Sequence, residues 1–197
     1  MKKKQPSGPP RRARAARGEP RSGSEGSGEL AEVEVRPLTA RSWPDVERLF
    51  GANGACGGCW CMHWRVERGA VEAVIAYSGG EPAAWCSFGP RPSFARLARS
   101  RVLAREAPTG TWSVVCFYVP ARWRRRGLGS RLLAAAADRA FALGAREVEG
   151  FPVEPRGGGT MPAAFAWTGV PALFEAAGFR PIERAPGLRP AWVRRHP

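Results

Sequence analysis

The chain has 197 residues, of which 44% are hydrophobic and 10% aromatic, enough apolar surface for one globular domain. Its formal net charge of +14 favours an anionic partner, either a nucleic acid or an anionic small molecule. No apolar run is long enough for a transmembrane helix, and no apolar segment follows the basic N-terminus as in a secretory signal. We therefore expect a cytoplasmic protein with no membrane partner and with reduced cysteines.

The first 28 residues differ in composition from the rest of the chain. They contain eight Lys and Arg residues, two Glu residues, and after Met1 no aliphatic residue larger than Ala. A segment so rich in Pro, Gly, Ser and Arg cannot offset the entropy lost on ordering. We expect residues 1–28 to form a disordered basic tail that either contacts nucleic acid weakly or is only solvated. Residues 30–197 then form the folded domain.

In the first half of this domain, the alternation of Val33 and Val35 is typical of a β-strand. Gly79-Gly80 separates two apolar runs, which is the pattern of a β-hairpin. The expected elements are a strand at 32–38, a helix from a cap at Ser42 or Asp45 to Phe50, an irregular segment at 51–64, a hairpin of 72–78 and 82–88, and a basic helix at about 92–103.

In the second half, residues 112–119 are apolar on both faces, as expected of a central strand that is covered on both sides. A helix follows at 128–143, with a stripe of Leu132, Ala136, Ala140 and Leu143, and Gly144 ends it. The remaining expected elements are strands at 146–151, 179–183 and 191–195, a loop at 154–167, and a helix capped by Thr168 that runs to Ala177. This order predicts a mixed α/β fold.

Residues 120–130, which lead from strand 112–119 into helix 128–143, read PARWRRRGLGS. A helix N-terminus binds phosphates because its first N–H groups are unpaired and its dipole is positive there. Gly127 and Gly129 let the backbone approach an anion without a Cβ, and the arginines add charge. A Walker loop is excluded because Gly-Lys-Ser/Thr is missing, and a dinucleotide fingerprint because its third Gly is missing. The other interpretation is a basic turn that only links strand and helix.

This stretch resembles the signature of the GNAT superfamily of acyl-CoA N-acyltransferases, Arg/Gln-x-x-Gly-x-Gly/Ala, at Arg124, Gly127 and Gly129. Residues 172–179, ALFEAAGF, also resemble the penultimate helix of that family, which ends in Gly-Phe. The resemblance implies an α/β fold with a single mixed, mostly antiparallel twisted sheet flanked by helices. It also implies acetyl-CoA as the co-substrate.

The same resemblance implies which residues bind the cofactor. The backbone of the central strand would pair with the pantetheine arm, and the turn would hold the pyrophosphate. The implied contacts are Phe117, Tyr118, Val119, Arg124, Arg125, Arg126, Gly127, Leu128, Gly129, Ser130 and Phe174.

The reaction implied is direct attack of a small-molecule or peptide amine on the acetyl thioester within a ternary complex. Many relatives have a tyrosine acid where this chain has Phe174, and phenylalanine has no proton to donate. Tyr118 or Thr168 could serve as a substitute donor to the leaving thiolate.

For the base that takes the amine proton, Glu147 and Glu149 lie on one face of the strand at 146–151. We choose Glu149 because it is nearer to the C-terminal end of that strand. The alternative is that each carboxylate pairs with an arginine.

Cys56, Cys59, Cys61 and His63 form the pattern C-x-x-C-x-C-x-H, which is tighter than known two-knuckle zinc sites. The alternatives are a zinc site, a reduced loop that lines the acceptor pocket, and ordinary core packing. We prefer the reduced loop and expect no metal.

Three functions compete. The first is an N-acetyltransferase, which the motif favours. The second is a catalytically idle acyl-CoA sensor, which the residue at position 174 allows. The third is a protein associated with nucleic acid or the ribosome, which the tail and the pI of ≈ 11.1 allow, although no recognition helix or RNA-binding signature is present. A homodimer is compatible with all three.

Overall fold

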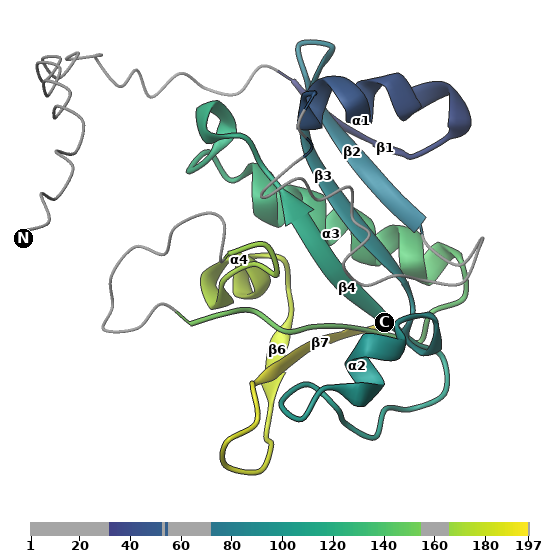
Figure 1. Ribbon diagram of the computed structural model, residues 1–197, viewed down its shortest axis with the longest axis vertical. Coiled ribbons are helices and arrows are strands. Elements are labelled where there is room, and N and C mark those ends of the chain that lie inside the picture. The colour runs from purple at the N-terminus through teal and green to yellow at the C-terminus, as the bar shows by residue number, and fades with distance from the viewer. Residues whose placement is uncertain (1–31, 53, 55–71, 155–165, 197) are drawn as a thin grey trace, which may run out of the picture.

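The computed structural model describes residues 32–52, 54, 72–154 and 166–196, which form one seven-stranded sheet with helices on both faces (Figure 1). The expected tail and the Cys56–His63 segment lie outside the described residues. The strand order is β1-β2-β3-β4-β5-β7-β6, and only β4 and β5 are parallel, as the predicted mixed sheet requires. The strands are β1 Val33–Pro37, β2 Glu72–Ser78, β3 Glu81–Pro90, β4 Thr111–Tyr118, β5 Glu147–Gly150, β6 Arg180–Ile182 and β7 Ala191–Arg195.

The helices cover the two faces of the sheet unequally. The α-helices are α1 Trp43–Phe50, α2 Ala95–Arg99, α3 Leu128–Ala142 and α4 Pro171–Ala176, with 3-10 turns η1 Ala40–Ser42, η4 Arg91–Ser93 and η5 Ala121–Trp123. The largest apolar cluster joins α3 and α4 to one face, through buried side chains such as Leu132 and Phe174. On the opposite face, α1 and α2 each cover a smaller cluster of their own. Among the described residues, no helix is both long and apolar enough to cross a membrane.

The hairpin of β2 and β3 forms where Gly79-Gly80 predicts it. Both glycines have positive φ, 58° and 79°, the conformation that two-residue hairpin turns require and that glycine adopts without a steric penalty. Behind this hairpin, β4 is buried over most of its length, from Ser113 to Phe117. The predicted central strand is therefore confirmed.

Two helices end earlier than their sequences predict. Helix α2 covers only Ala95–Arg99, because Ser100 is extended and its hydroxyl accepts hydrogen bonds from the next backbone N–H groups, including that of Leu103 at 3.2 Å. Helix α3 ends at Ala142, and Leu143 is the C-cap with 38% of its surface exposed. Leu143 is therefore not part of the buried stripe, which continues instead through Phe141.

Candidate functional site

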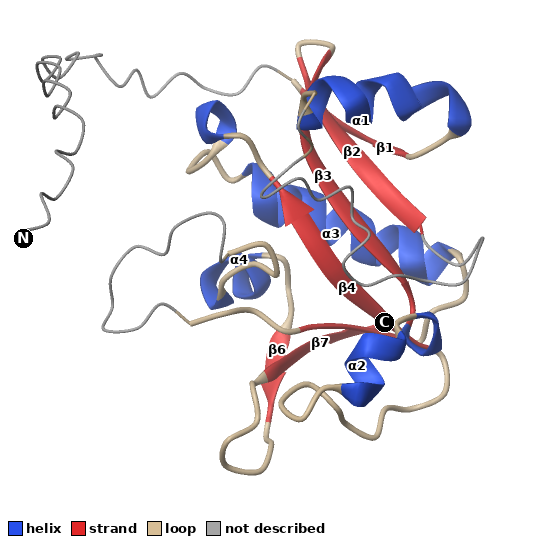
Figure 2. Cartoon of the chain, in the orientation of Figure 1, coloured by secondary structure: helices blue, strands red, loops and turns tan. Residues whose placement is uncertain are grey.

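The strands β4 and β5 pair over only three residues and then separate. Thr111, Trp112 and Ser113 lie opposite Glu147, Val148 and Glu149, whereas β4 continues to Tyr118 and β5 ends at Gly150. We call the first part the paired end, and the residues beyond it, 114–119 of one strand and 150–153 of the other, the splayed end. Helix α4 lies on the α3 side of the sheet near this end, as Figure 2 shows beside β4.

A β-bulge marks the start of the splayed end. Phe88 of β3 pairs with Val114 of β4, and the neighbouring Ser87 pairs with Cys116. One step along β3 therefore corresponds to two residues along β4. The extra residue, Val115, interrupts the alternation, so Val115 and Cys116 both pack in the cluster under α2. A bulge bends its strand and increases the local twist. The bulge therefore lies where the pairing of β4 with β5 stops.

A turn at residues 166–169 bridges the two separated strands. The Phe117 N–H donates to the Trp167 carbonyl at 2.8 Å, and the Val153 N–H donates to the Gly169 carbonyl at 2.9 Å. The turn is closed by a bond from the Gly169 N–H to the Ala166 carbonyl, also at 2.9 Å. Phe117, the first of the three residues predicted to pair with pantetheine, therefore already has an internal backbone partner.

Phe174 packs beneath this turn and is fully buried. A Cβ added at Gly150 would lie 2.4 Å from its ring, and a Cβ added at Gly169 would lie 2.8 Å from the other side of the ring. The Phe117 and Phe179 rings meet it edge-on, with centroids 6.1 and 5.2 Å away. Phe174 is thus a core residue, and its predicted contact with the cofactor stays a prediction.

Thr168 does not cap α4, contrary to the sequence prediction. The N-cap is Val170, which makes no side-chain cap bond, and Pro171 begins the helix. The Thr168 side chain is 5% exposed, and its Oγ1 atom has no hydrogen-bond partner in the part of the chain that the structure describes. Buried hydroxyl groups are normally paired, so this one requires an explanation.

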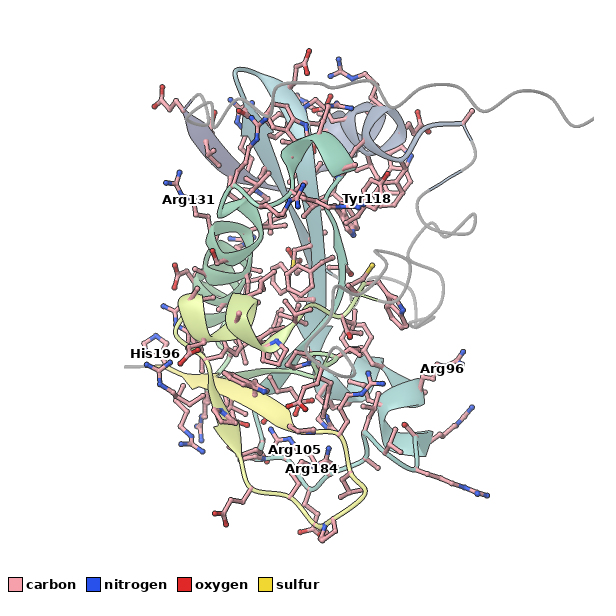
Figure 3. The ribbon with its side chains drawn as sticks, turned by 90° about the vertical axis from the view of Figure 1, so that its left-hand side faces the viewer. Arg96, Arg105, Tyr118, Arg131, Arg184 and His196 are labelled. Atoms are coloured by element: carbon pink, nitrogen blue, oxygen red, sulfur yellow. The ribbon has the colours of Figure 1, made fainter. Side chains whose placement is uncertain are left out.

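Tyr118, the other candidate proton donor, follows Phe117 and points to the opposite face of the sheet. Its ring meets Phe50 of α1 edge-on at 5.1 Å and is partly exposed. Figure 3 shows Tyr118 near α1, at the same end of the molecule as the first turns of α3. The two candidate donors therefore approach the splayed end from different elements.

The glycine-rich turn connects the splayed end to α3. Gly127 is the N-cap, with φ 73°, and a Cβ built there would meet nothing within 4 Å. The first amides of α3, which a phosphate could approach, follow this uncrowded glycine directly. Arg125 also has a positive φ, 60°, which is uncommon for a residue with a side chain.

Gly129 lies against α4, and its predicted contact with the cofactor stays a prediction. A Cβ at this position would lie 2.6 Å from the Leu173 Cδ1 atom of α4. A side chain at Gly129 would displace the end of the Leu173 side chain, so a substitution there would change the contact between α3 and α4 as well as the turn. Of the two glycines, only Gly127 faces open space.

Exposed arginines surround the turn. Arg122 and Arg126 lie over the ring of Trp123, with guanidinium carbons 5.7 and 5.9 Å from its centroid. Arg124 Nε donates to the Val119 carbonyl at 2.7 Å. Val119 is thus the second residue predicted to pair with pantetheine that already has an internal hydrogen-bond partner. The positive charge therefore gathers around the N-terminus of α3, where the helix dipole adds to it.

Glu149, the predicted base, is fully buried at the paired end. Arg91 and Ser113 donate to its Oε1, the serine at 2.7 Å, and Arg105 Nε donates to its Oε2 at 2.5 Å. Both carboxylate oxygens are thus bound by internal donors, two of them cationic. This surrounding argues against the predicted role as a base, because a base must reach the acceptor amine.

Glu147 belongs to the same ion-pair network. Its Oε1 accepts a bond from Arg105 Nη2 at 2.5 Å, and its Oε2 lies 3.3 Å from Arg195. Burial lowers the pKa of Arg105, but Glu149 and Glu147 raise it by more, so this pKa lies above its ordinary value. Both glutamates therefore pair with arginine, the alternative that the sequence left open. Figure 3 shows Arg105 beside Arg184, whose pKa is lowered by burial and by the charge of Arg105.

The candidate zinc ligands Cys56, Cys59, Cys61 and His63 lie outside the described residues. In the described ranges, no group of three or more His, Cys, Asp and Glu side chains is arranged to hold a metal ion. The sequence prediction for this segment therefore stays a prediction.

Comparisons with known proteins identify the fold. Three solved structures resemble the chain: an aminoglycoside acetyltransferase, AAC(6')-Ib, in complex with coenzyme A (TM-score 0.51, 16% identity, covering 83% of this chain and 95% of that one); a GNAT family N-acetyltransferase, YhbS, from Escherichia coli with CoA (0.52, 16%, 87% and 85%); and a GCN5-related N-acetyltransferase from Kribbella flavida (0.52, 19%, 83% and 98%). At these identities, the likeness shows a shared fold. No curated protein matches the sequence significantly.

A family model adds evidence from the sequence itself. The model described as the Acetyltransferase (GNAT) family matches residues 34–155, a range that includes β4, the glycine-rich turn, α3 and β5. This range is more than half of the chain. The chain therefore belongs to the GNAT family of acetyltransferases.

Proposed function

We propose that this protein transfers the acetyl group of acetyl-CoA to a primary amine by direct attack within a ternary complex. The observation that carries the proposal is the turn before α3, where Gly127 is left-handed and faces open space. Pyrophosphate is anionic, and a helix N-terminus with adjacent arginines is suited to bind it. The family membership and the coenzyme A bound in two of the similar structures support this choice of co-substrate.

In this proposal, the residues of the turn hold the diphosphate. The contacts proposed are the amides and side chains of Arg124, Arg125, Arg126, Gly127, Leu128, Gly129 and Ser130. Ser130 Oγ donates to the Gly127 carbonyl at 2.9 Å, a bond within the first turn of α3. Acetyl-CoA supplies the activated acetyl thioester when it is bound.

The arm of the cofactor is proposed to follow the edge of β4 at Phe117, Tyr118 and Val119. Two backbone groups on this edge already form hydrogen bonds within the protein: the Phe117 N–H and the Val119 carbonyl. Binding therefore either uses the remaining groups or displaces the Trp167 carbonyl. The family membership supports this location.

Proton transfer needs a donor and an acceptor in the protein or in water. Tyr118 is the proposed donor to the sulfur, because it ends β4 and its side chain is partly exposed. Since Glu149 is enclosed by arginines, we propose that the amine proton leaves to water. Tyr118→Phe should lower turnover by at most about 10²-fold, because a thiol with a pKa of ~8.5 leaves without full protonation. Cofactor affinity should not change.

The experiment that tests the proposed function measures thioester cleavage with acetyl-CoA across a panel of small-molecule and peptide amines. Cleavage that depends on the amine supports acetyl transfer. Binding of coenzyme A without cleavage by any amine would favour a sensor instead. Salt-dependent retention on nucleic acid without coenzyme A binding would favour the nucleic-acid alternative.

Gly127→Ala tests the proposed diphosphate site, with Gly144→Ala as its matched control. Both glycines flank α3, both have positive φ (73° and 94°), and neither Cβ would meet another atom within 4 Å. Each substitution should therefore cost about 1–2 kcal/mol in backbone strain. Only Gly127→Ala should weaken coenzyme A binding, measured by isothermal titration calorimetry. Equal affinities in the two variants would contradict the proposed site.

A further inference from the structure

We propose that the Thr168 hydroxyl is a cofactor-binding group that forms a hydrogen bond with the pantetheine–thioester arm of acetyl-CoA. This inference rests on the proposed function and adds a side chain outside the GNAT signature motif. Its starting point is the buried Oγ1 atom that has no hydrogen-bond partner within the described ranges. Thr168 is 5% exposed, so bulk water does not solvate the hydroxyl freely. An unpaired buried hydroxyl is unfavourable, and a ligand that pairs with it removes this cost.

The position of Thr168 relative to β4 identifies the ligand. The peptide group that joins Trp167 to Thr168 carries the carbonyl that accepts the Phe117 N–H at 2.8 Å. Thr168 therefore follows directly after the carbonyl that is hydrogen-bonded to the edge of β4, along which we propose that the arm lies. The arm contains two amides and a thioester, and each of these groups can pair with a hydroxyl.

The surroundings of Thr168 support a role in binding over a role in the core. The next residue, Gly169, has a positive φ of 83°, and a Cβ added there would lie 2.8 Å from the Phe174 ring, so this position requires glycine. The Gly169 carbonyl is also fixed by the Val153 N–H at 2.9 Å. The Thr168 hydroxyl is thus attached to a backbone anchored on both strands of the splayed end, which preorganises it for a ligand.

A second threonine provides the matched comparison. Thr111 is 3% exposed and lies in the same strand as Phe117, but at the paired end. Its Oγ1 donates to the Pro108 carbonyl at 2.7 Å and lies 3.4 Å from the Glu147 Oε1 atom. The two buried hydroxyl groups therefore differ mainly in whether the protein itself pairs them. Valine is nearly isosteric with threonine and removes only the hydroxyl at each position.

The experiment compares Thr168→Val, Thr168→Ser and Thr111→Val with the full-length wild type. Thermal unfolding without ligand should show a rise of about 2–4 °C in the melting temperature for Thr168→Val, because the unpaired hydroxyl is removed. Thr111→Val should melt at a lower temperature, because it removes the hydrogen bond that the buried Thr111 hydroxyl donates inside the protein. A lower melting temperature for Thr168→Val would show that the hydroxyl is paired inside the protein and would overturn the proposal.

Binding is then measured by calorimetry with two ligands, coenzyme A and 3′-phospho-ADP, which lacks the arm. Thr168→Val should bind coenzyme A about 3- to 10-fold more weakly and 3′-phospho-ADP with unchanged affinity, and Thr168→Ser should restore coenzyme A binding. Thr111→Val should bind both as the wild type does. Wild-type affinity of Thr168→Val for coenzyme A, or an equal loss for both ligands, would overturn the inference while leaving the proposed function in place. If the wild type binds no coenzyme A, both fail together.

Discussion

The two ends of the parallel pair of β4 and β5 differ in whether their buried polar side chains have hydrogen-bond partners within the protein. At the paired end, Glu147 and Glu149 are buried and each is bound by arginine. At the splayed end, a turn bridges the strands and the Thr168 hydroxyl has no partner within the described residues. Buried polar groups whose hydrogen bonds are all made within the protein stabilise the fold. A buried polar group without an internal partner can still form a hydrogen bond with a ligand. Substitutions at the paired end should therefore change stability, and those at the splayed end should change binding.

The largest effect on stability is expected for Arg105→Ala. The side chain of Arg105 is 10% exposed and pairs with Glu147 and Glu149. Removing one partner from a buried ion pair leaves uncompensated charge, which typically costs about 3–5 kcal/mol. Urea unfolding should show this decrease in the free energy of unfolding. Arg195→Ala is the control, because the side chain of Arg195 is 71% exposed although it lies 3.3 Å from Glu147, and exposed pairs contribute about 0–1 kcal/mol.

A similar loss for both arginine variants would show that burial does not distinguish these two ion pairs. A small loss for Arg105→Ala would show that water or another group compensates the glutamates. Either result would remove the contrast between the two ends of the strand pair.

An intermediate effect is expected for Glu149→Gln. The substitution keeps the shape but removes the charge that pairs with Arg91 and Arg105, so the free energy of unfolding should fall by about 1–3 kcal/mol. If Glu149 is structural, the turnover of the remaining folded enzyme should be close to wild type at every pH. A base at this position would instead give a loss of about 10²–10⁴-fold that shrinks as the pH rises and the acceptor deprotonates. The pH profile of turnover therefore decides between the two roles.

The smallest effect is expected away from both ends, where Tyr77 of β2 donates to Asp45 of α1 at 2.6 Å. This bond and the contact with Arg48 hold the pKa of Asp45 below its ordinary value, whereas burial and the contact with Asp45 raise the pKa of Tyr77 to about 12. The stabilisation from Asp45 is therefore present above the ordinary aspartate pKa and is lost as the pH falls through the lowered one.

Tyr77→Phe should thus be less stable than the wild type at neutral pH, and the difference should shrink in acid. Thermal unfolding from neutral pH to below about pH 4 measures this change. A difference that does not vary with pH would show that the tyrosine acts through packing alone. Coenzyme A binding should be the same in both proteins.

Several features of the fold follow from local sequence. The hairpin at Gly79-Gly80, the covered strand β4 and the helix that begins at Leu128 were predicted correctly, because each depends on turn chemistry or hydrophobic periodicity within a few residues. The family resemblance at Arg124, Gly127 and Gly129 is equally local, and the family model confirms the family that it implies. The end of α2 was predicted wrongly, because it depends on the geometry of a side chain: Ser100 Oγ accepts a hydrogen bond from the Leu103 N–H.

The sequence by itself therefore determined the element types, the position of the basic turn and the family. Only the tertiary structure decided what each polar or glycine residue does. Glu149 has two arginine partners from segments 58 and 44 residues away in sequence, and Gly129 faces Leu173 of α4. Thr168 lies beside β4 through a bond between Trp167 and Phe117. These contacts join residues distant in the chain, and no local pattern encodes which distant groups meet once the sheet has formed.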